Sequence, residues 1–155
     1  MFRNHDPDAV LVSRVDSHSP LASYSPHGIR LDDADWPSVE HYYHAMKFED
    51  PGIRETIRTA PHPDRAAKLA RRRRRHMRRD WDDVKEVYMT RGMYTKCRTH
   101  AQVAEALLAT GEQTIVETSQ YDYYWGCGRD TRGLNVYGRV LENVRQRLRS
   151  EKSDT

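Results

Sequence analysis

The sequence lacks the features that mark secreted, membrane-spanning and disulfide-stapled proteins. It holds only two cysteines, Cys97 and Cys127, too few for a disulfide framework or a four-cysteine zinc site. No apolar run approaches the roughly 20 residues of a transmembrane helix. Residues 1–10 contain no apolar stretch long enough for a signal peptide. These absences predict a cytoplasmic protein with two reduced thiols and no membrane partner.

The common cofactor motifs are also missing. The sequence has no Walker-type phosphate loop, no G-x-G-x-x-G dinucleotide fingerprint and no G-x-S-x-G nucleophile elbow. His41 and His44 are three residues apart, but no third ligand stands at a spacing typical of a zinc site. We therefore expect a protein that works without a bound cofactor and without a metal.

The residues that are present suffice for one folded domain. The chain has 155 residues, of which 37% are hydrophobic and 32% charged, and this fits the usual size and composition of a single domain. Helical periodicity recurs in several segments, whereas only three short stretches have a strand pattern. The sequence predicts a single compact α+β domain over residues 1–155, mainly helical with a few short strands. Its core is expected at about 10–149, followed by a polar tail at 150–155.

Local patterns predict the individual elements. Apolar and β-branched residues predict strands at 10–15, 29–31 and 114–118, and residues 32–35 have turn chemistry. The pattern T-x-x-Q that begins at Thr99 is typical of a capping box. Helices are expected to begin at Pro37 or Ser38, after Pro51, at Asp64 (ending at about Arg75), after Asp80, after Thr99 (ending at Gly111) and at Asn135 (ending at Arg149).

Arginine is abundant and unevenly distributed. The chain carries 21 arginines and 5 lysines with a net charge of +3, and seven of the arginines fall between Arg71 and Arg79. A net charge this small does not by itself indicate a nucleic-acid binder, and GC-rich coding also enriches arginine. Most of the run is expected to be a solvated surface. One or two of its guanidinium groups are candidates for binding phosphate through paired donors.

The first segment with unusual chemistry is Trp36–Tyr43, at the start of a predicted helix. Glu40, His44 and Lys47 fall on one stripe of this helix, beside an apolar stripe. A carboxylate in the first turn is stabilised by the helix dipole, so Glu40 can be a simple electrostatic cap. The alternative is that Glu40 lies at a pocket wall with His44 beside it. His41 is expected to be structural or on the surface.

The second segment is Tyr121–Gly128, which places four aromatic residues and Asp122 in a predicted loop at 119–134. Aromatic side chains next to a carboxylate suit a planar, electron-rich ligand at the mouth of a pocket. The alternative is a loop held in place by burial of its aromatic side chains. Because a loop of this length with aromatic content is rarely disordered, we expect it to be ordered, with Trp125 lining the pocket.

Together these segments resemble the signature of the NADAR family, also called YbiA-like, over about Leu21 to Leu148. The sequence departs from the family pattern at Ser23, where an asparagine is usual, at His44, where a glutamine is usual, and at Cys97, where a phenylalanine is usual. These departures fit a changed substrate preference with the acidic residues kept. The motifs that carry the resemblance are Trp36–Tyr42 with Lys47-Phe48, Arg71, Arg78–Trp81, Leu107–Gly111 with Glu117, Asp122–Gly128, and Gly133, Asn135, Gly138 and Arg145.

The resemblance implies an N-glycosidase with a YbiA-like fold. Some family members cleave the C1′–N bond of phosphoribosylamino-pyrimidine intermediates of riboflavin biosynthesis, and others remove ADP-ribose from guanine bases. The resemblance implies that Glu40, Asp122 and Trp125 carry the chemistry. The residues expected to bind substrate and phosphate are Ser23, Tyr24, His44, Lys47, Arg71, Gly126 and Asn135.

These residue types are compatible with such a reaction. Cleavage of an N-riboside passes through an oxocarbenium-like cation, which a carboxylate near C1′ stabilises. The leaving base departs more readily when an acid protonates it. Glu40 is assigned to activate the water and stabilise the cation, and Asp122 is assigned to the ribose or the leaving group. The exchanged assignment is equally compatible. Trp125 is expected to stack on the heterocycle.

Three questions stay open at this point. The substrate is either a small phosphorylated riboside, including one from a specialised flavin-like pathway, or ADP-ribosylated nucleic acid. A non-catalytic nucleotide or nucleic-acid binding module would use the arginine run and the aromatic loop without turnover. A pure interaction domain explains neither Glu40 nor the loop. The sequence gives no indication of the oligomeric state.

Overall fold

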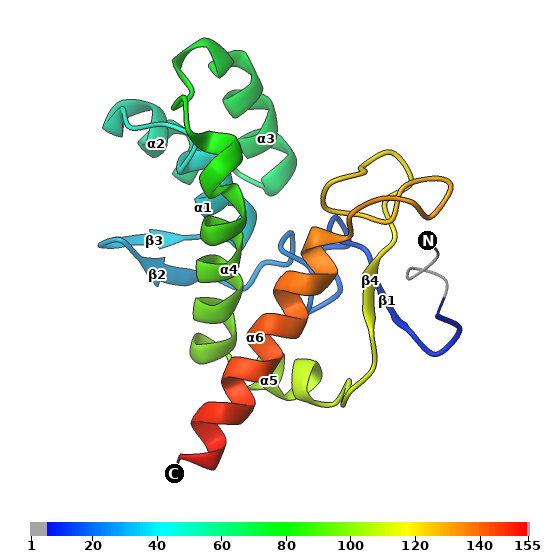
Figure 1. The fold of residues 1–155 in the computed structure, drawn as a ribbon. Helices are drawn as coiled ribbons and strands as arrows, with labels where there is room; N and C mark the ends of the chain where they lie inside the picture. The colour runs from blue at the N-terminus through cyan, green and yellow to red at the C-terminus, as the bar shows by residue number, and fades with distance from the viewer. Residues whose placement is uncertain (1–5, 155) are drawn as a thin grey trace. The chain divides into compact units, whose positions relative to one another are not determined.

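A computed structural model describes residues 6–154 of the chain. Within this range it contains six α-helices, one 3₁₀ helix and four three-residue strands (Figure 1). The predicted class, a mainly helical α+β protein with a few short strands, is confirmed. In chain order the elements are β1 Val10–Val12, β2 Ile29–Leu31, β3 Ala34–Trp36, α1 Val39–Ala45, α2 Pro51–Arg58, α3 Pro63–Arg72, η2 Arg74–His76, α4 Trp81–Thr99, α5 Ala101–Leu108, β4 Ile115–Glu117 and α6 Val136–Ser153.

The chain forms two compact units. The terminal unit consists of the chain up to Ser25 and from His100 onward, and the central unit consists of Pro26–Thr99. No helix between residues 6 and 154 is both long and apolar enough to cross a membrane. That residues 1–155 act as one domain stays a prediction.

A small parallel sheet and the helix α6 organise the terminal unit. The strands β1 and β4 pair in parallel, with Val10 opposite Ile115 and Val12 opposite Glu117. The helix α6 packs against β4 and α5. It continues to Ser153, so most of the predicted polar tail is helical. The predicted inward residues of α6 are buried, namely Tyr137, Val140, Leu141, Val144 and Leu148.

Gly138 on α6 lies where no side chain fits. A Cβ at this position would overlap the carbonyl oxygen of Ile115 and the side chain of Asn135. In a helix interior, replacing glycine by alanine usually stabilises the protein by about 0.5–1 kcal/mol. For Gly138→Ala we expect the opposite sign, a loss of about 1–3 kcal/mol in the free energy of unfolding measured with urea. Ser150→Ala, at an exposed position of the same helix, is the control, and a Gly138→Ala protein as stable as wild type would contradict the close packing.

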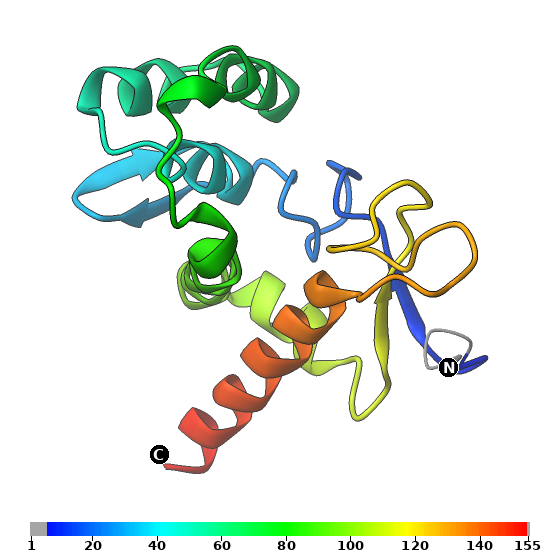
Figure 2. The same ribbon diagram turned by 45° about the horizontal axis from the view of Figure 1, so that its top comes forward.

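In the central unit, the helix α1 is enclosed by other elements. It packs against α2, α3 and α4, and all seven of its residues are buried. The helices α2 and α3 also lie side by side (Figure 2). The side chains of Ser38 and Asp50 cap α1 and α2 by accepting from backbone N–H groups. The predicted start of α1 is confirmed, whereas α2 begins at Pro51 and not after it.

The strands β2 and β3 form an antiparallel hairpin in which Ile29 lies opposite Trp36. Asp32 and Asp33 form its two-residue turn, with φ angles of 54° and 62°. Positive φ at both central residues is typical of the mirror-image turns that match the twist of hairpin strands. The predicted turn at 32–35 was therefore too long, because Ala34 already belongs to β3.

Several predicted helix boundaries are wrong. The helix α5 ends at Leu108 rather than at Gly111, and α6 ends at Ser153 rather than at Arg149. The helix expected to run to about Arg75 ends at Arg72 and continues as the short 3₁₀ helix η2. The capping box at Thr99 does not form, because α4 continues through Thr99 and its hydroxyl donates to the carbonyl of Thr95 at 2.7 Å. The helix α5 instead begins after His100, which makes no side-chain cap.

Lys96 on α4 is fully buried, and this burial lowers its pKa from 10.5 to about 7. Between these pH values the unfolded chain binds more protons than the folded protein. We therefore expect stability to rise with pH across this window, by up to about 1.4 kcal/mol per pH unit. The measurement is the urea midpoint as a function of pH. Its rise with pH should be smaller in Lys96→Met, whereas Lys68→Met, at an exposed site, should show the same rise as wild type. Parallel curves for wild type and Lys96→Met would contradict the shift.

Candidate functional site

The helix α1 carries the first candidate residues of the central unit. Because α1 is short and packed against three other helices, its polar side chains are buried together with its apolar ones. The polar and apolar stripes expected from the sequence therefore do not differ in exposure. This enclosure sets the environment of Glu40 and His44.

Glu40 is fully buried, and His44 is only 7% exposed. Glu40 Oε1 lies 3.1 Å from Nε2 of His44, one helical turn further along α1. A carboxylate removed from water interacts more strongly with a nearby positive charge than an exposed one does. Glu40 is thus not a solvent-exposed helix cap. The pair has the groups needed to hold a proton or to face a cation that develops during a reaction.

His41 is part of the scaffold. Its Nε2 donates to the carbonyl oxygen of Ala60 at 3.0 Å, and its Nδ1 accepts from the hydroxyl of Ser38 at 2.7 Å. Desolvation by burial lowers the pKa of the imidazole. A neutral ring with both nitrogens engaged confirms the structural interpretation of His41.

Lys47 lies just beyond α1, which ends at Ala45, so it is not on the helical stripe predicted for it. Its Nζ lies 5.3 Å from the centroid of the Tyr43 ring, a cation–π distance. The same ring lies 5.2 Å from the His44 ring and 5.1 Å from that of Trp81. The structure therefore brings Lys47 and His44 to one aromatic side chain.

Arg71 is placed apart from this group. It is exposed on α3 and lines a hollow formed otherwise by Lys68, Arg72, Arg74 and Arg75. None of Glu40, His44 and Lys47 lines this hollow. The role of Arg71 as a phosphate ligand stays a prediction.

The loop between β4 and α6 carries the candidates of the terminal unit, and it is ordered as predicted. The Cys127 N–H donates to the carbonyl of Glu117 at 2.9 Å, and the Asn135 N–H donates to that of Gly126 at 3.0 Å. Asp122 fixes the first turn, because its Oδ1 accepts from the N–H groups of Tyr124 and Trp125 at 3.0 and 2.8 Å. The carboxylate of Asp122 is thereby held by the chain itself.

Trp125 is 5% exposed and belongs to a buried aromatic group. Its ring centroid lies 4.8 Å from that of Tyr124 and 6.5 Å from that of Tyr137. Burial of Trp125 supports the interpretation of a loop held by its aromatic side chains. Tyr121 of the same loop is 86% exposed and takes no part in this packing. That Trp125 lines a substrate pocket stays a prediction.

Arg14 is a candidate that the sequence did not reveal. Its guanidinium carbon lies 5.8 Å from the Trp125 ring and 5.9 Å from the Tyr24 ring. Arg14 therefore contacts two of the predicted site residues. An arginine after a three-residue strand gives no local signal of such a contact.

Glu117 belongs to the family resemblance noted in the sequence, but its structural role appears only in the structure. It is fully buried, and its Oε2 accepts from the Arg14 N–H at 2.7 Å while Oε1 accepts from the Ser119 N–H at 2.9 Å. A Cβ at Gly126 would stand 2.5 Å from Oε1, so Gly126 lets the loop pass close to this carboxylate. Glu117 thus fixes the aromatic loop against the end of β1.

Asn135 joins β4 to α6. Its Nδ2 donates to the carbonyl of Ile115, and its Oδ1 accepts from the N–H of Glu117, both at 2.8 Å. Its φ of 50° is the left-handed conformation that asparagine tolerates better than most residues. Both polar atoms of this side chain are used within the fold. Contacts of Asn135 and Gly126 with a substrate stay predictions.

The remaining candidates of the terminal unit are less informative. Ser23 is fully buried, and the Tyr24 N–H donates to the carbonyl of Arg14 at 3.3 Å. Burial raises the pKa of the Cys127 thiol, which disfavours the thiolate that a nucleophile requires. Residues 6–154 hold no cluster of three or more His, Cys, Asp and Glu side chains placed to bind a metal ion.

The chain is similar to a family model, to several known proteins and to a solved structure. A family model described as the NADAR domain matches residues 1–149. The N-glycosidase Npun_R5314 of Nostoc punctiforme is 44% identical over 133 residues, 84% of this chain and 85% of that protein. The chloroplastic riboflavin biosynthesis protein PYRR of Zea mays is 34% identical over 148 residues, 86% of this chain but 24% of the longer protein. The NMR structure of the Escherichia coli protein YbiA superposes with a TM-score of 0.84 at 33% identity, covering 97% of this chain and 92% of that one.

Proposed function

Because the chain belongs to the NADAR family, we propose that it hydrolyses the C1′–N bond of a phosphorylated N-riboside. Ribosylamino-pyrimidine phosphates of riboflavin biosynthesis are the substrates we favour. The names of two relatives, an N-glycosidase and a riboflavin biosynthesis protein, support this choice. The observation that carries the proposal is the buried Glu40, whose Oε1 lies 3.1 Å from His44.

In the proposed reaction, Glu40 acts on water and on the developing cation. The C1′–N bond breaks, the ribose carbon gains positive charge, and a water oxygen forms the new bond to C1′. Glu40 accepts a proton from this water and stabilises the cation. The leaving nitrogen takes a proton, so that the products are free base and ribose phosphate. His44, whose Nε2 lies 3.1 Å from Glu40 Oε1, is the polar group placed beside this carboxylate.

Asp122 and Trp125 are assigned to the two ends of the scissile bond. Asp122 serves the ribose or the leaving nitrogen, and Trp125 stacks on the heterocycle, a contact typically worth about 1–3 kcal/mol. The two hydrogen bonds that Asp122 accepts from the loop backbone support a carboxylate of fixed position. Substrate and phosphate contacts are assigned to Ser23, Tyr24, His44, Lys47, Arg71, Gly126 and Asn135.

Product analysis by mass tests this proposal directly. The protein is incubated in parallel with a ribosylamino-pyrimidine phosphate and with an oligonucleotide that carries ADP-ribose on guanine. Release of free pyrimidine and ribose phosphate is the expected result. Release of ADP-ribose alone would assign the protein to the other substrate class. Binding of either compound without any cleavage would make it a non-catalytic nucleotide-binding module.

A further inference from the structure

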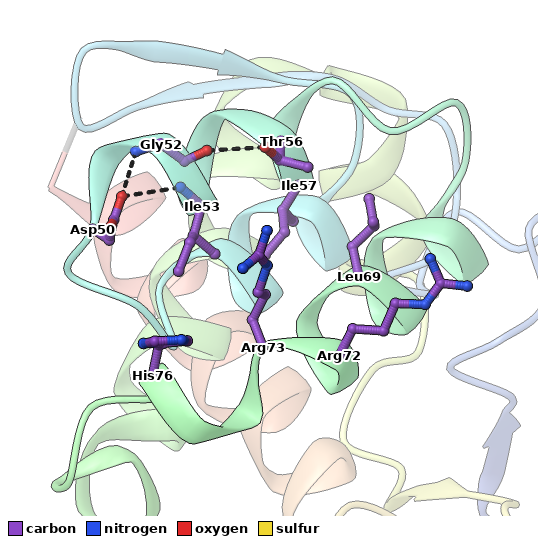
Figure 3. Close-up of a pocket in the computed structure, with 9 residues that line it drawn as sticks. All are labelled: Asp50, Gly52, Ile53, Thr56, Ile57, Leu69, Arg72, Arg73 and His76. Carbon is purple, nitrogen blue, oxygen red and sulfur yellow. Dashed lines mark hydrogen bonds between the residues drawn. The ribbon is translucent and has the colours of Figure 1, made fainter.

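A cavity of about 420 Å³ lies in the central unit between α2, α3 and η2. Ile53, Ile57 and Leu69 form an apolar side, and Arg72, Arg73 and His76 form a basic side. Figure 3 shows Arg73 extending toward Ile57, whereas Arg72 extends in a different direction. The volume of this cavity falls within the range of small-molecule pockets. Neither Glu40 nor His44 lines this cavity, so the cavity is distinct from the site around the Glu40–His44 pair.

A second hollow, of about 640 Å³, adjoins this cavity and shares Arg72 with it. Its lining consists only of basic residues, namely Lys68, Arg71, Arg72, Arg74 and Arg75. We call the two hollows together the arginine surface. It combines one apolar recess with a neighbouring group of cationic side chains.

The cations of the arginine surface are not neutralised within the described part of the chain. Between residues 6 and 154, no carboxylate lies within 4.0 Å of a charged nitrogen of Lys68 or of Arg71 to Arg75. Other arginines of the central unit do have such partners, as Arg58 has Glu55 and Arg78 has Asp80. Like charges gathered without counterions attract a polyanion.

One carboxylate, that of Asp50, lines the cavity between α2, α3 and η2, and its hydrogen bonds lie within α2. Asp50 caps α2, accepting from the N–H groups of Gly52 and Ile53 at 2.7 and 3.2 Å (Figure 3). Its charge therefore interacts with the positive end of the helix dipole. The basic side of the cavity, which faces the second hollow, carries no such acid.

We propose that the arginine surface binds the phosphate backbone of a single-stranded nucleic acid, with one nucleoside entering the apolar recess. Arg71 and Arg72 belong to α3, and Arg74 and Arg75 belong to η2. Guanidinium groups carried by two elements suit a chain of phosphates better than a single one. Guanidinium groups form paired hydrogen bonds with phosphate oxygens. The apolar side chains and His76 offer a surface for an unstacked base, which a duplex does not expose. Arg71 is also assigned to substrate phosphate and is therefore left unchanged in the test below. With the other residues of the arginine surface, this proposal does not depend on the N-glycosidase activity.

The test is fluorescence anisotropy with a labelled single-stranded oligonucleotide, over a range of salt concentrations. The variant carries Arg72→Gln, Arg73→Gln and Arg75→Gln, three exposed positions outside the proposed catalytic machinery. For three phosphate contacts at about 0.7 counterions each, we expect affinity about 100-fold lower at 0.1 M salt and a salt slope smaller by about 2. Hydrolysis of the ribosylamino-pyrimidine phosphate should be unchanged.

A matched variant controls for net charge. Arg139→Gln, Arg147→Gln and Lys152→Gln remove three exposed charges from α6 and should leave binding nearly unchanged. Replacing Arg72, Arg73 and Arg75 by lysine should retain most of the salt dependence. The proposal is overturned if both glutamine variants lose equal affinity, if binding is insensitive to salt, if a duplex binds as tightly, or if an oligoglutamate peptide competes as well as the nucleic acid.

Discussion

Glu40→Gln is expected to lower turnover of the N-riboside by at least about 100-fold while the protein stays folded. Glutamine keeps the shape and hydrogen-bonding capacity of the side chain, but it accepts no proton and balances no cation. Glu40 is fully buried, and its Oε1 lies 3.1 Å from His44 Nε2. Because solvent does not reach this position, neither water nor a dissolved ion can take the place of the lost negative charge. Turnover and thermal unfolding should be measured on the same preparation.

A matched substitution separates chemistry from a general effect of charge. Glu55→Gln removes an exposed carboxylate of the central unit that pairs with Arg58, and it should change neither turnover nor stability by much. If Glu40 only caps α1, Glu40→Gln would lower stability by at most about 1 kcal/mol and leave turnover intact. Full turnover in a folded Glu40→Gln protein would leave Asp122 as the only acidic candidate.

Trp125→Ala is expected to lower kcat/KM by about 100-fold, which corresponds to loss of a stacking contact near 3 kcal/mol. Because Trp125 is 5% exposed and packs on Tyr124 and Tyr137, the same change should cost about 3–5 kcal/mol of stability. Activity must therefore be measured at a temperature where circular dichroism shows the variant to be folded. Trp125→Phe should recover much of both losses.

Tyr121→Ala is the control for this loop. Tyr121 is 86% exposed, so its loss should affect neither packing nor kcat/KM. A purely structural Trp125 would give a different pattern, in which Trp125→Ala lowers the melting temperature but the folded fraction keeps the wild-type kcat/KM. That result would remove Trp125 from the site and leave it as a packing residue.

Features that depend on a few neighbouring residues were predictable from the sequence. Ser38 begins helix α1 because its side chain accepts a hydrogen bond from the N–H group three residues further along. The buried face of α6 followed from helical periodicity. The pattern at Thr99 failed for the complementary reason: α4 continues through this residue, and the packing of a long helix outweighs a local capping preference.

In the candidate site, too, some features were predictable from the sequence and others depend on tertiary packing. Glu40, Asp122 and Trp125 were identified from composition, position and a family resemblance, all of which are readable in the chain. The complete burial of Glu40 depends on the helices that surround α1, which no local pattern specifies. The contact of Arg14 with Glu117 joins residues 103 positions apart. Hydrogen bonds and aromatic packing at such separations exist only after the chain has folded, so the tertiary structure alone decided them.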